Sequence, residues 1–188
     1  MTTPAGGPAI EVIDEPWGSE LGTTLVDALL ADLDVRYGPW DGSALTPPPG
    51  PPPDGAWPAP QSAPPADGRW AVAPDAVRRP LGTFLVAWSE GRAVGCGALR
   101  PLPGGRETDA EIKRMFTIAE VRGRGVGRAV LAHLEGTARE LGYQRMFLAT
   151  GTAQPEAMAL CVSASWSPVA PYGDYCGAEQ TRCFGLVL

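Results

Sequence analysis

The sequence predicts an α/β fold in which a mixed β-sheet carries helices on its faces. Strand-like runs alternate with helix-like runs in the second half of the chain, and two strand-like runs separated by a turn signal precede them. The chain has 188 residues, 44% of them hydrophobic, which is enough for one domain with its own core and too little for two. We therefore expect a single domain over residues 1–188.

The first third of the chain predicts a strand, a helix and an insertion. Residues 10–13 favour a strand, and residues 21–37 favour a helix with one apolar stripe made of Leu25, Leu29, Leu30 and Leu33. From position 46 to position 65, ten of twenty residues are proline, which blocks helix interiors and cannot donate to a β-ladder. We expect a flexible insertion of polyproline character at about 46–66, and a docking role for an SH3-like partner stays open there.

The remaining elements follow in a regular order. Strands are expected at 83–88, 93–100, 110–118, 145–150 and 182–188, and helices at 125–141 and 155–164. The dipeptide Glu90-Gly91 predicts a hairpin turn, Gly142 predicts the end of the longer helix, and Pro155 fits the first turn of the shorter one. Residues 169–175 are expected to be irregular or a short strand.

Charge is distributed unevenly along the chain. The net charge of −6 argues against a nucleic-acid partner, because nucleic-acid binders usually carry the opposite balance. Between positions 100 and 128, however, seven basic residues stand against four acidic ones. A local basic site in an acidic chain suits a small anionic ligand.

The cysteines and the apolar runs predict compartment and chemistry. Cys96, Cys161, Cys176 and Cys183 are widely spaced and form no CxxC pair, so we expect reduced thiols and no metal site. No run of 18 or more apolar residues occurs, and residues 1–10 lack the pattern of a secretory signal. We expect a cytoplasmic protein with no membrane partner.

The segment that points to chemistry is 110–128, with the sequence AEIKRMFTIAEVRGRGVGR. It predicts a strand, a glycine-rich loop and the start of a helix. Glycines let a backbone approach a ligand closely, and a helix start offers unpaired amide groups and a positive dipole end. Together these features predict an anion site for a phosphate or pyrophosphate on the amides of residues 123–127.

Two common glycine-rich motifs do not fit this loop. The spacing of Gly123, Gly125 and Gly127 is not that of the dinucleotide fingerprint, and no Gly-Lys-Ser/Thr follows as a P-loop requires. What remains is Arg-x-x-Gly-x-Gly, beginning at Arg122.

This loop and its flanks resemble motif A of the GNAT N-acetyltransferases, in which an R/Q-x-x-G-x-G/A loop binds the pyrophosphate of acetyl-CoA. The preceding strand AEIKRMFT, the upstream GCGALRPL and the downstream LATGTAQPEAMAL match the family's elements in the correct order, so the resemblance covers roughly residues 81–175. It implies a mixed, mostly antiparallel central sheet of about six to seven strands with helices on both faces. It also implies acetyl-CoA as the co-substrate.

The resemblance assigns cofactor-binding roles to residues of this chain. The loop would cradle the pyrophosphate, and the backbone of the preceding strand would lie along the pantetheine arm. The family's asparagine before the last helix falls on Gln154. The implied cofactor-binding residues are Met115, Phe116, Thr117, Arg122, Gly123, Arg124, Gly125, Val126, Gly127, Arg128 and Gln154.

The resemblance also suggests catalytic residues. Acyl transfer needs a deprotonated amine, and Glu111 fits the position of the glutamate that some members use as a general base. Its alternative is a surface carboxylate paired with Lys113 or Arg114, and Asp109 and Glu107 are weaker candidates. The family's proton-donating tyrosine is replaced by Cys161, and its glycine by Ser165. Either Cys161 protonates the leaving thiolate, or Tyr172 or Tyr175 takes this role, or the step needs no dedicated acid.

The expected function is transfer of an acetyl group from acetyl-CoA to a primary amine on a small molecule or a peptide. The alternative is a catalytically impaired CoA-binding fold that acts as a sensor or interaction module. A scaffold that presents the proline-rich segment is the third interpretation. A homodimer stays open. His133, the only histidine, is expected to be a partly exposed helical residue without a catalytic role.

Overall fold

A computed structural model describes residues 9–38 and 72–188, so the insertion expected at 46–66 lies outside the described residues. One sheet holds seven strands in the order β1-β2-β3-β4-β5-β7-β6. The strands are β1 (Ile10–Asp14), β2 (Thr83–Ser89), β3 (Arg92–Pro101), β4 (Asp109–Thr117), β5 (Arg145–Gly151), β6 (Ser167–Val169) and β7 (Thr181–Val187). The α-helices are α1 (Glu20–Tyr37), α2 (Val126–Glu140) and α3 (Pro155–Ser163).

The sheet is mixed and mostly antiparallel, which confirms the predicted fold class. Every neighbouring pair of strands is antiparallel except β4 and β5, which run parallel. The connection between those two strands is α2, as a parallel crossover requires. Glu90 and Gly91 both have positive φ and make the tight β2–β3 hairpin turn that the sequence predicts.

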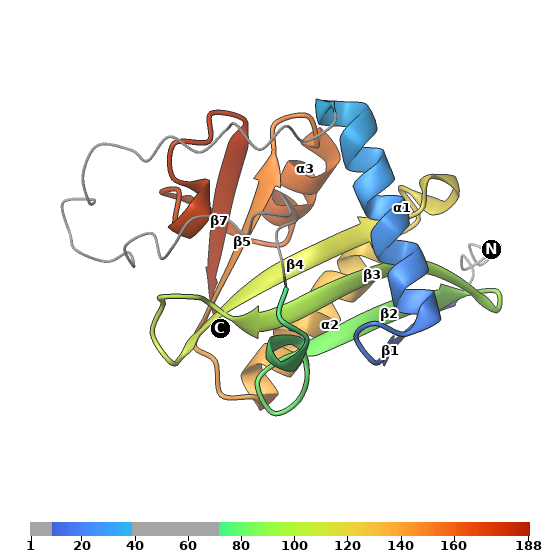
Figure 1. The fold of residues 1–188 in the computed structure, drawn as a ribbon, viewed down its shortest axis with the longest axis horizontal. Coiled ribbons are helices and arrows are strands. Elements are labelled where there is room, and N and C mark those ends of the chain that lie inside the picture. Colours follow the sequence, from blue (N-terminus) through green and yellow to red (C-terminus); the bar gives the residue numbers. More distant parts are fainter. Residues whose placement is uncertain (1–8, 39–71) are drawn as a thin grey trace, which may run out of the picture.

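Helices cover the two faces of the sheet, with α1 on one face and α2 on the other (Figure 1). The strand residues alternate accordingly. Leu85 and Ala87 pack in the cluster that contains α2, whereas Phe84 and Val86 pack in the cluster that contains Leu25 of α1. The period of two along β2 thus places two separate cores on opposite faces.

The α2 helix packs closely on β3. Its buried stripe consists of Val126, Val130, Leu131, Leu134 and Ala138, at the three- and four-residue steps of an amphipathic helix. A Cβ at Gly97 of β3 would lie 2.8 Å from Val130 Cγ1 and 2.9 Å from Leu134 Cδ1, so only glycine lets the helix approach this strand.

The α1 helix begins at a side-chain cap, because Ser19 Oγ accepts a hydrogen bond from the Gly22 amide at 3.0 Å. It buries Leu25 and Leu29 of the predicted stripe, while Leu30 and Leu33 are only partly buried. A short 3₁₀ turn (Pro74–Val77), which the sequence pattern did not reveal, adds Val77 to the same core.

Residues 169–175, expected to be irregular or a short strand, are mostly irregular. The strand β6 ends at Val169, and a 3₁₀ turn (Gly173–Tyr175) lies in the stretch that follows it. No helix within residues 9–38 and 72–188 combines the length and apolarity needed to cross a membrane.

Candidate active site

The glycine-rich loop joins β4 to α2 through a 3₁₀ turn (Ala119–Val121). Gly123 has φ of 78° and Gly125, the N-cap of α2, has φ of 88°, a left-handed backbone that favours glycine. A Cβ at either position would meet no heavy atom within 4 Å. The glycines are therefore required by the backbone turn, and the space beside them is open.

The start of α2 offers amide groups to a ligand. Within the described residues no side chain caps this helix, and its first backbone bond is from the Ala129 amide to the Gly125 carbonyl, at 3.0 Å. The amides of Val126, Gly127 and Arg128 precede that bond and point out of the helix end. Such a helix start attracts an anion through its amide protons and its dipole.

The arginines of the loop differ in their surroundings. Arg124 and Arg128 are exposed, and Arg128 hydrogen-bonds the Ser163 carbonyl and hydroxyl at the end of α3. Arg122 contacts β4 and α1: its Nε donates to the Thr117 carbonyl at 3.1 Å, and its Nη2 lies 2.8 Å from Asp32 Oδ1 of α1.

The sheet opens into a wedge between β4 and β5. These strands pair only over four residue pairs, from Asp109–Arg145 to Ile112–Leu148. Beyond that point β4 continues to Thr117 and β5 to Gly151 without pairing with each other. Backbone groups that face the wedge can hydrogen-bond an inserted ligand as an added strand would.

A bulge in β4 lies just beyond the apex of this wedge. The β3–β4 register shifts between Cys96 and Ala98, opposite β4 residues 113–116, and Arg114 has a positive φ of 56°. Bulges bend a strand and redirect its side chains. The bend separates the end of β4 from β5, so that residues 115–117 border the wedge.

The wedge and the loop open into one groove of about 1540 Å³. Its lining includes nearly all residues for which the sequence predicts cofactor contacts: Met115, Phe116, Thr117, Arg122, Gly123, Gly125, Val126, Gly127, Arg128 and Gln154. Arg124, which is exposed, is the one predicted contact outside the lining.

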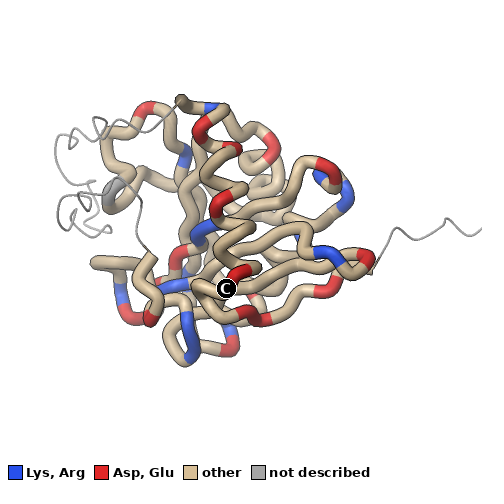
Figure 2. Tube along the Cα trace, turned by 45° about the vertical axis from the view of Figure 1, so that its right-hand side comes forward, with Lys and Arg blue, Asp and Glu red and all other residues tan. Residues whose placement is uncertain are grey.

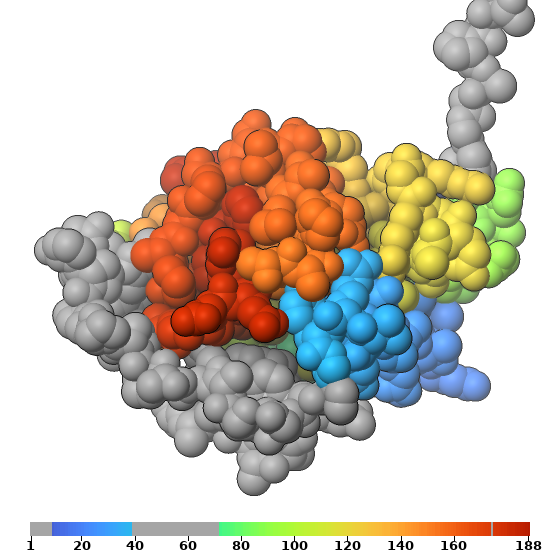
Figure 3. Space-filling model, turned by 90° about the horizontal axis from the view of Figure 1, so that it is seen from above, coloured from blue at the N-terminus to red at the C-terminus, as the bar shows by residue number. Residues whose placement is uncertain are grey.

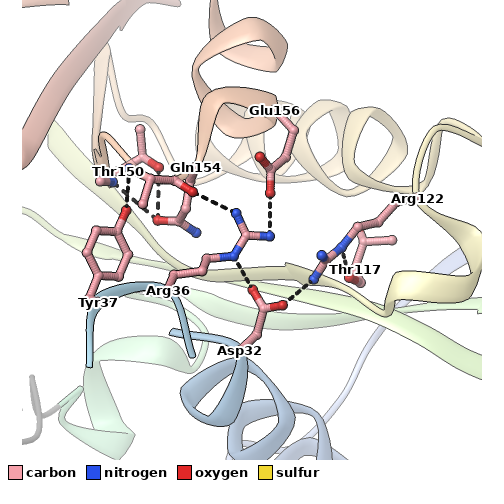
Figure 4. A network of polar contacts seen from close by, with 10 residues as sticks. Asp32, Arg36, Tyr37, Thr117, Arg122, Thr150, Gln154 and Glu156 are labelled. Atoms are coloured by element: carbon pink, nitrogen blue, oxygen red, sulfur yellow. Dashed lines mark hydrogen bonds and ion pairs between the residues drawn. The ribbon is translucent and has the colours of Figure 1, made fainter. Parts of the chain in front are cut away.

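The C-terminal end of α1 closes one side of the groove through a polar network (Figure 4). Asp32 accepts hydrogen bonds from Arg122 and Arg36, each at 2.8 Å, and Arg36 also reaches Glu156 at 2.7 Å. Tyr37 accepts a bond from the Ala153 amide at 3.0 Å. The view from above shows the same end of α1, in light blue, against the orange residues that begin α3 (Figure 3).

The network perturbs the carboxylates in it. Burial disfavours the charged form of Asp32, but hydrogen bonds and charge attraction from Arg122 and Arg36 outweigh burial and lower its pKa. The pKa of Glu156 is lowered in the same way: burial opposes ionisation, and the hydrogen bond from Arg36 outweighs it. Both groups are partly exposed, so each ion pair contributes modestly to stability.

Basic and acidic positions lie near one another along much of the chain trace (Figure 2). Among the described residues, the ion pairs Arg100–Glu111 and Arg145–Asp109 each contain a buried carboxylate. Glu111, the predicted base, is 1% exposed and does not line the groove. Arg100 donates to Glu111 Oε2 from Nε at 2.9 Å and from Nη2 at 2.6 Å. Lys113 Nζ lies 3.8 Å from Glu111 Oε1. The alternative, a surface carboxylate paired with Lys113 or Arg114, is therefore right about the pairing with Lys113 but wrong about the surface position.

Two tyrosines meet at Glu111. Tyr172 is 2% exposed and donates to Glu111 Oε1 at 3.3 Å, and it does not line the groove. Tyr175 lines the groove, accepts a hydrogen bond from Lys113 Nζ and stacks edge-on against Tyr172. Burial, followed by the Glu111 charge, raises the pKa of both phenols well above the ordinary value of 10.0.

Cys161 lines the groove from α3 and is 3% exposed. Burial raises the pKa of its thiol to about 11, so the thiol stays protonated at neutral pH. Gln154 precedes α3, where its side-chain oxygen accepts from the Gly151 amide at 3.2 Å. His133 is exposed on α2 and contacts the Ala129 carbonyl of its own helix, away from the groove.

Sequence reasoning missed the polar network of α1. Asp32 and Arg36 are four residues apart, the spacing of an ion pair on a helix surface, but nothing in the sequence shows that they contact Arg122 and Glu156. It also weighed Tyr172 and Tyr175 together, whereas only Tyr175 borders the groove.

Comparisons with known proteins agree with this architecture. The IAA acetyltransferase of Azospirillum brasilense is 38% identical over 93 residues, which cover 49% of this chain and 59% of that protein, less than two thirds of its length. The uncharacterized N-acetyltransferase YsnE of Bacillus subtilis (strain 168) is 34% identical over 116 residues, covering 61% of this chain and 74% of the relative.

Solved structures share the fold. A Klebsiella pneumoniae protein, for which acyl-CoA N-acyl transfer has been suggested, superposes with a TM-score of 0.67 at 20% identity and covers 95% of this chain and 97% of its own. An acetyltransferase of Streptococcus agalactiae superposes with a TM-score of 0.64 at 15% identity, covering 95% and 98%. The model of the Acetyltransferase (GNAT) family matches residues 51–163. The chain belongs to the GNAT acetyltransferase family.

Proposed function

We propose that this chain transfers an acetyl group from acetyl-CoA to a primary amine, which attacks the thioester directly. The observation that carries the proposal is the junction of an anion-binding helix start and an open strand wedge in one groove. A pyrophosphate group and an amide-containing arm ending in a thioester need these two surfaces in this order. The names of the relatives support an amine as the acceptor.

The amides at the start of α2 would hold the pyrophosphate, with Arg128 and Arg124 as exposed cations nearby. The arm would lie along residues 115–117 and hydrogen-bond their backbone as an added strand. The thioester would then reach the apex of the wedge, where the pairing of β4 and β5 ends at Ile112 and Leu148.

The reaction requires a neutral amine, because an ammonium group has no lone pair. An alkyl amine with a pKa of about 10 must lose a proton before or during the attack. The nitrogen lone pair forms the N–C bond, the C–S bond breaks with its electron pair on sulfur, and one proton moves from nitrogen to sulfur. The protein must provide a path for that proton.

Cys161 is a weak candidate for the proton donor. A thiol whose pKa is raised to about 11 holds its proton more tightly than an ordinary thiol with a pKa of about 8.5, so transfer to a leaving thiolate is unfavourable. The same observation favours the second candidate function, a CoA-binding member of the family without catalysis. Turnover with an amine decides between the two.

Calorimetric titration with acetyl-CoA tests the binding site. Gly125→Asn keeps a residue that tolerates left-handed backbone and adds a side chain in the open space at the helix start. We expect its dissociation constant to rise at least tenfold, about 1.4 kcal/mol. The matched control is Gly142→Asn at the other end of α2, where φ is 86° and the space is also open.

Unchanged affinity in a folded Gly125→Asn variant would place the phosphate site elsewhere. Release of free CoA thiol with a panel of amines then tests catalysis in the unmodified chain. Binding of acetyl-CoA without thiol release from any amine would support the non-catalytic function. Thiol release that depends on an amine would support acetyl transfer.

A further inference from the structure

We infer that the Tyr175 hydroxyl is a catalytic proton relay between the acceptor nitrogen and the buried Glu111 carboxylate. The inference rests on the proposed function, since it assigns the proton path of that reaction. It also gives Glu111 a role that direct contact with an acceptor cannot provide, because the carboxylate is 1% exposed and lies outside the groove lining.

Tyr175 is placed where the reaction would occur. It borders the groove together with Lys113, which is the first β4 residue beyond the last pair with β5, Ile112–Leu148. The Lys113 ammonium donates to the phenol oxygen and lies 4.9 Å from the centre of the ring. The hydroxyl is therefore held beside the apex of the wedge, to which the thioester is assigned.

The two oxygens of the Glu111 carboxylate have different neighbours. Oε2 accepts two hydrogen bonds from Arg100, at 2.9 and 2.6 Å. Oε1 accepts from Tyr172 at 3.3 Å and lies 3.8 Å from Lys113 Nζ. The Tyr175 oxygen lies close to the same carboxylate, because Lys113 Nζ contacts both the phenol oxygen and Glu111 Oε1. The phenol of Tyr175 thus lies between the groove and a buried carboxylate, in position to pass a proton from one to the other.

The protonation states suit a relay. The raised pKa of Tyr175, caused first by burial and then by the Glu111 charge, keeps the phenol protonated at neutral pH. A protonated phenol can donate to the carboxylate and still accept a proton through its oxygen lone pairs. Lys113 lies beside that oxygen, and its positive charge would stabilise negative charge that develops there during transfer.

The step balances without any further reactant. As the N–C bond forms, the nitrogen becomes positively charged and gives a proton to the Tyr175 oxygen, while the phenol proton moves to Glu111. When the C–S bond breaks, its electron pair stays on sulfur. Glu111 then returns a proton to the phenol, and the phenol protonates the sulfur. The products are an amide and free CoA thiol, and the protein is unchanged.

Tyr175→Phe tests the relay by removing the hydroxyl and keeping the ring. We expect kcat with a competent amine to fall about 10²–10⁴-fold, the usual contribution of a positioned acid or base. The dissociation constant for acetyl-CoA and the thermal midpoint should stay near those of the unmodified chain. Tyr143→Phe is a neutral control, because that hydroxyl bonds the Leu81 carbonyl outside the groove.

Tyr172→Phe separates a relay from support of Glu111, because Tyr172 contacts the same carboxylate but does not border the groove. A loss of kcat at least tenfold smaller than that of Tyr175→Phe supports the relay. Equal losses in the two variants, or wild-type kcat in Tyr175→Phe, overturn it. If the unmodified chain releases no thiol with any amine, the proposed function itself fails, and the two failures are thus distinguished.

Discussion

The same substitution at two glycines of α2 should have opposite effects on stability. Gly125, the N-cap, has φ of 88°, and a Cβ there would meet no atom within 4 Å. The cost of Gly125→Ala is therefore the cost of left-handed backbone alone, about 1–2 kcal/mol. Gly136 lies in the helix interior without positive φ, and a Cβ there also meets nothing within 4 Å. Gly136→Ala should therefore stabilise by about 0.4–1 kcal/mol.

These energies convert into measurable melting temperatures. For a domain of this size, 1 kcal/mol shifts the midpoint by about 2–4 °C. We expect Gly125→Ala to melt about 2–8 °C below the unmodified chain and Gly136→Ala about 1–4 °C above it, by circular dichroism without ligand. Equal midpoints for the two variants, or a rise for Gly125→Ala, would refute the assignment of a left-handed backbone at Gly125.

Three further predictions follow from the buried groups and the α1 network. Arg100→Met should lower the unfolding free energy by about 3–5 kcal/mol in denaturant titrations, because it removes the guanidinium that compensates the buried Glu111 charge. Arg100→Lys keeps a positive charge and should lower the unfolding free energy less. Asp32→Asn should cost about 1 kcal/mol at neutral pH. The pKa of Asp32 is lowered in the folded state from the ordinary value of 3.8. The difference in unfolding free energy between the unmodified chain and Asp32→Asn should therefore be complete above pH 3.8 and should vanish as the pH falls through the lowered pKa. A difference that does not change with pH would contradict the lowered pKa. Alkylation at pH 8, followed by peptide mass spectrometry, should modify the partly exposed Cys176 before Cys161, whose buried thiol has a pKa of about 11; equal rates would contradict the burial.

Local patterns in the sequence predict the elements well. The apolar stripe of α2, the Glu90-Gly91 hairpin and the strand before the glycine loop lie within one or two residues of their expected bounds. These features depend on hydrophobic periodicity and on the residues at turns and helix ends, and neighbouring residues in the sequence determine all of them. The loop that points to phosphate binding is also local, so its residues could be assembled from sequence.

Features that depend on tertiary contacts could not be predicted in this way. Glu111 has the right residue type for a base, but its burial against Arg100 depends on the register of β3 with β4, which pairs the two directly. The choice between Tyr172 and Tyr175 depends on how a segment without regular periodicity crosses the face of β5 and β7. The contact between Arg122 and Asp32 joins residues 90 positions apart.

The short seam between β4 and β5 has a consequence for hydrogen exchange. Amide groups in the middle of a seven-stranded sheet are normally among the slowest to exchange, because they open only with the whole domain. Here four residue pairs hold the two strands, and backbone groups beyond Ile112 and Leu148 face the wedge. The most central strands of this protein should therefore contain fast-exchanging amides beside slow ones, and a molecule seated in the wedge would slow only the former.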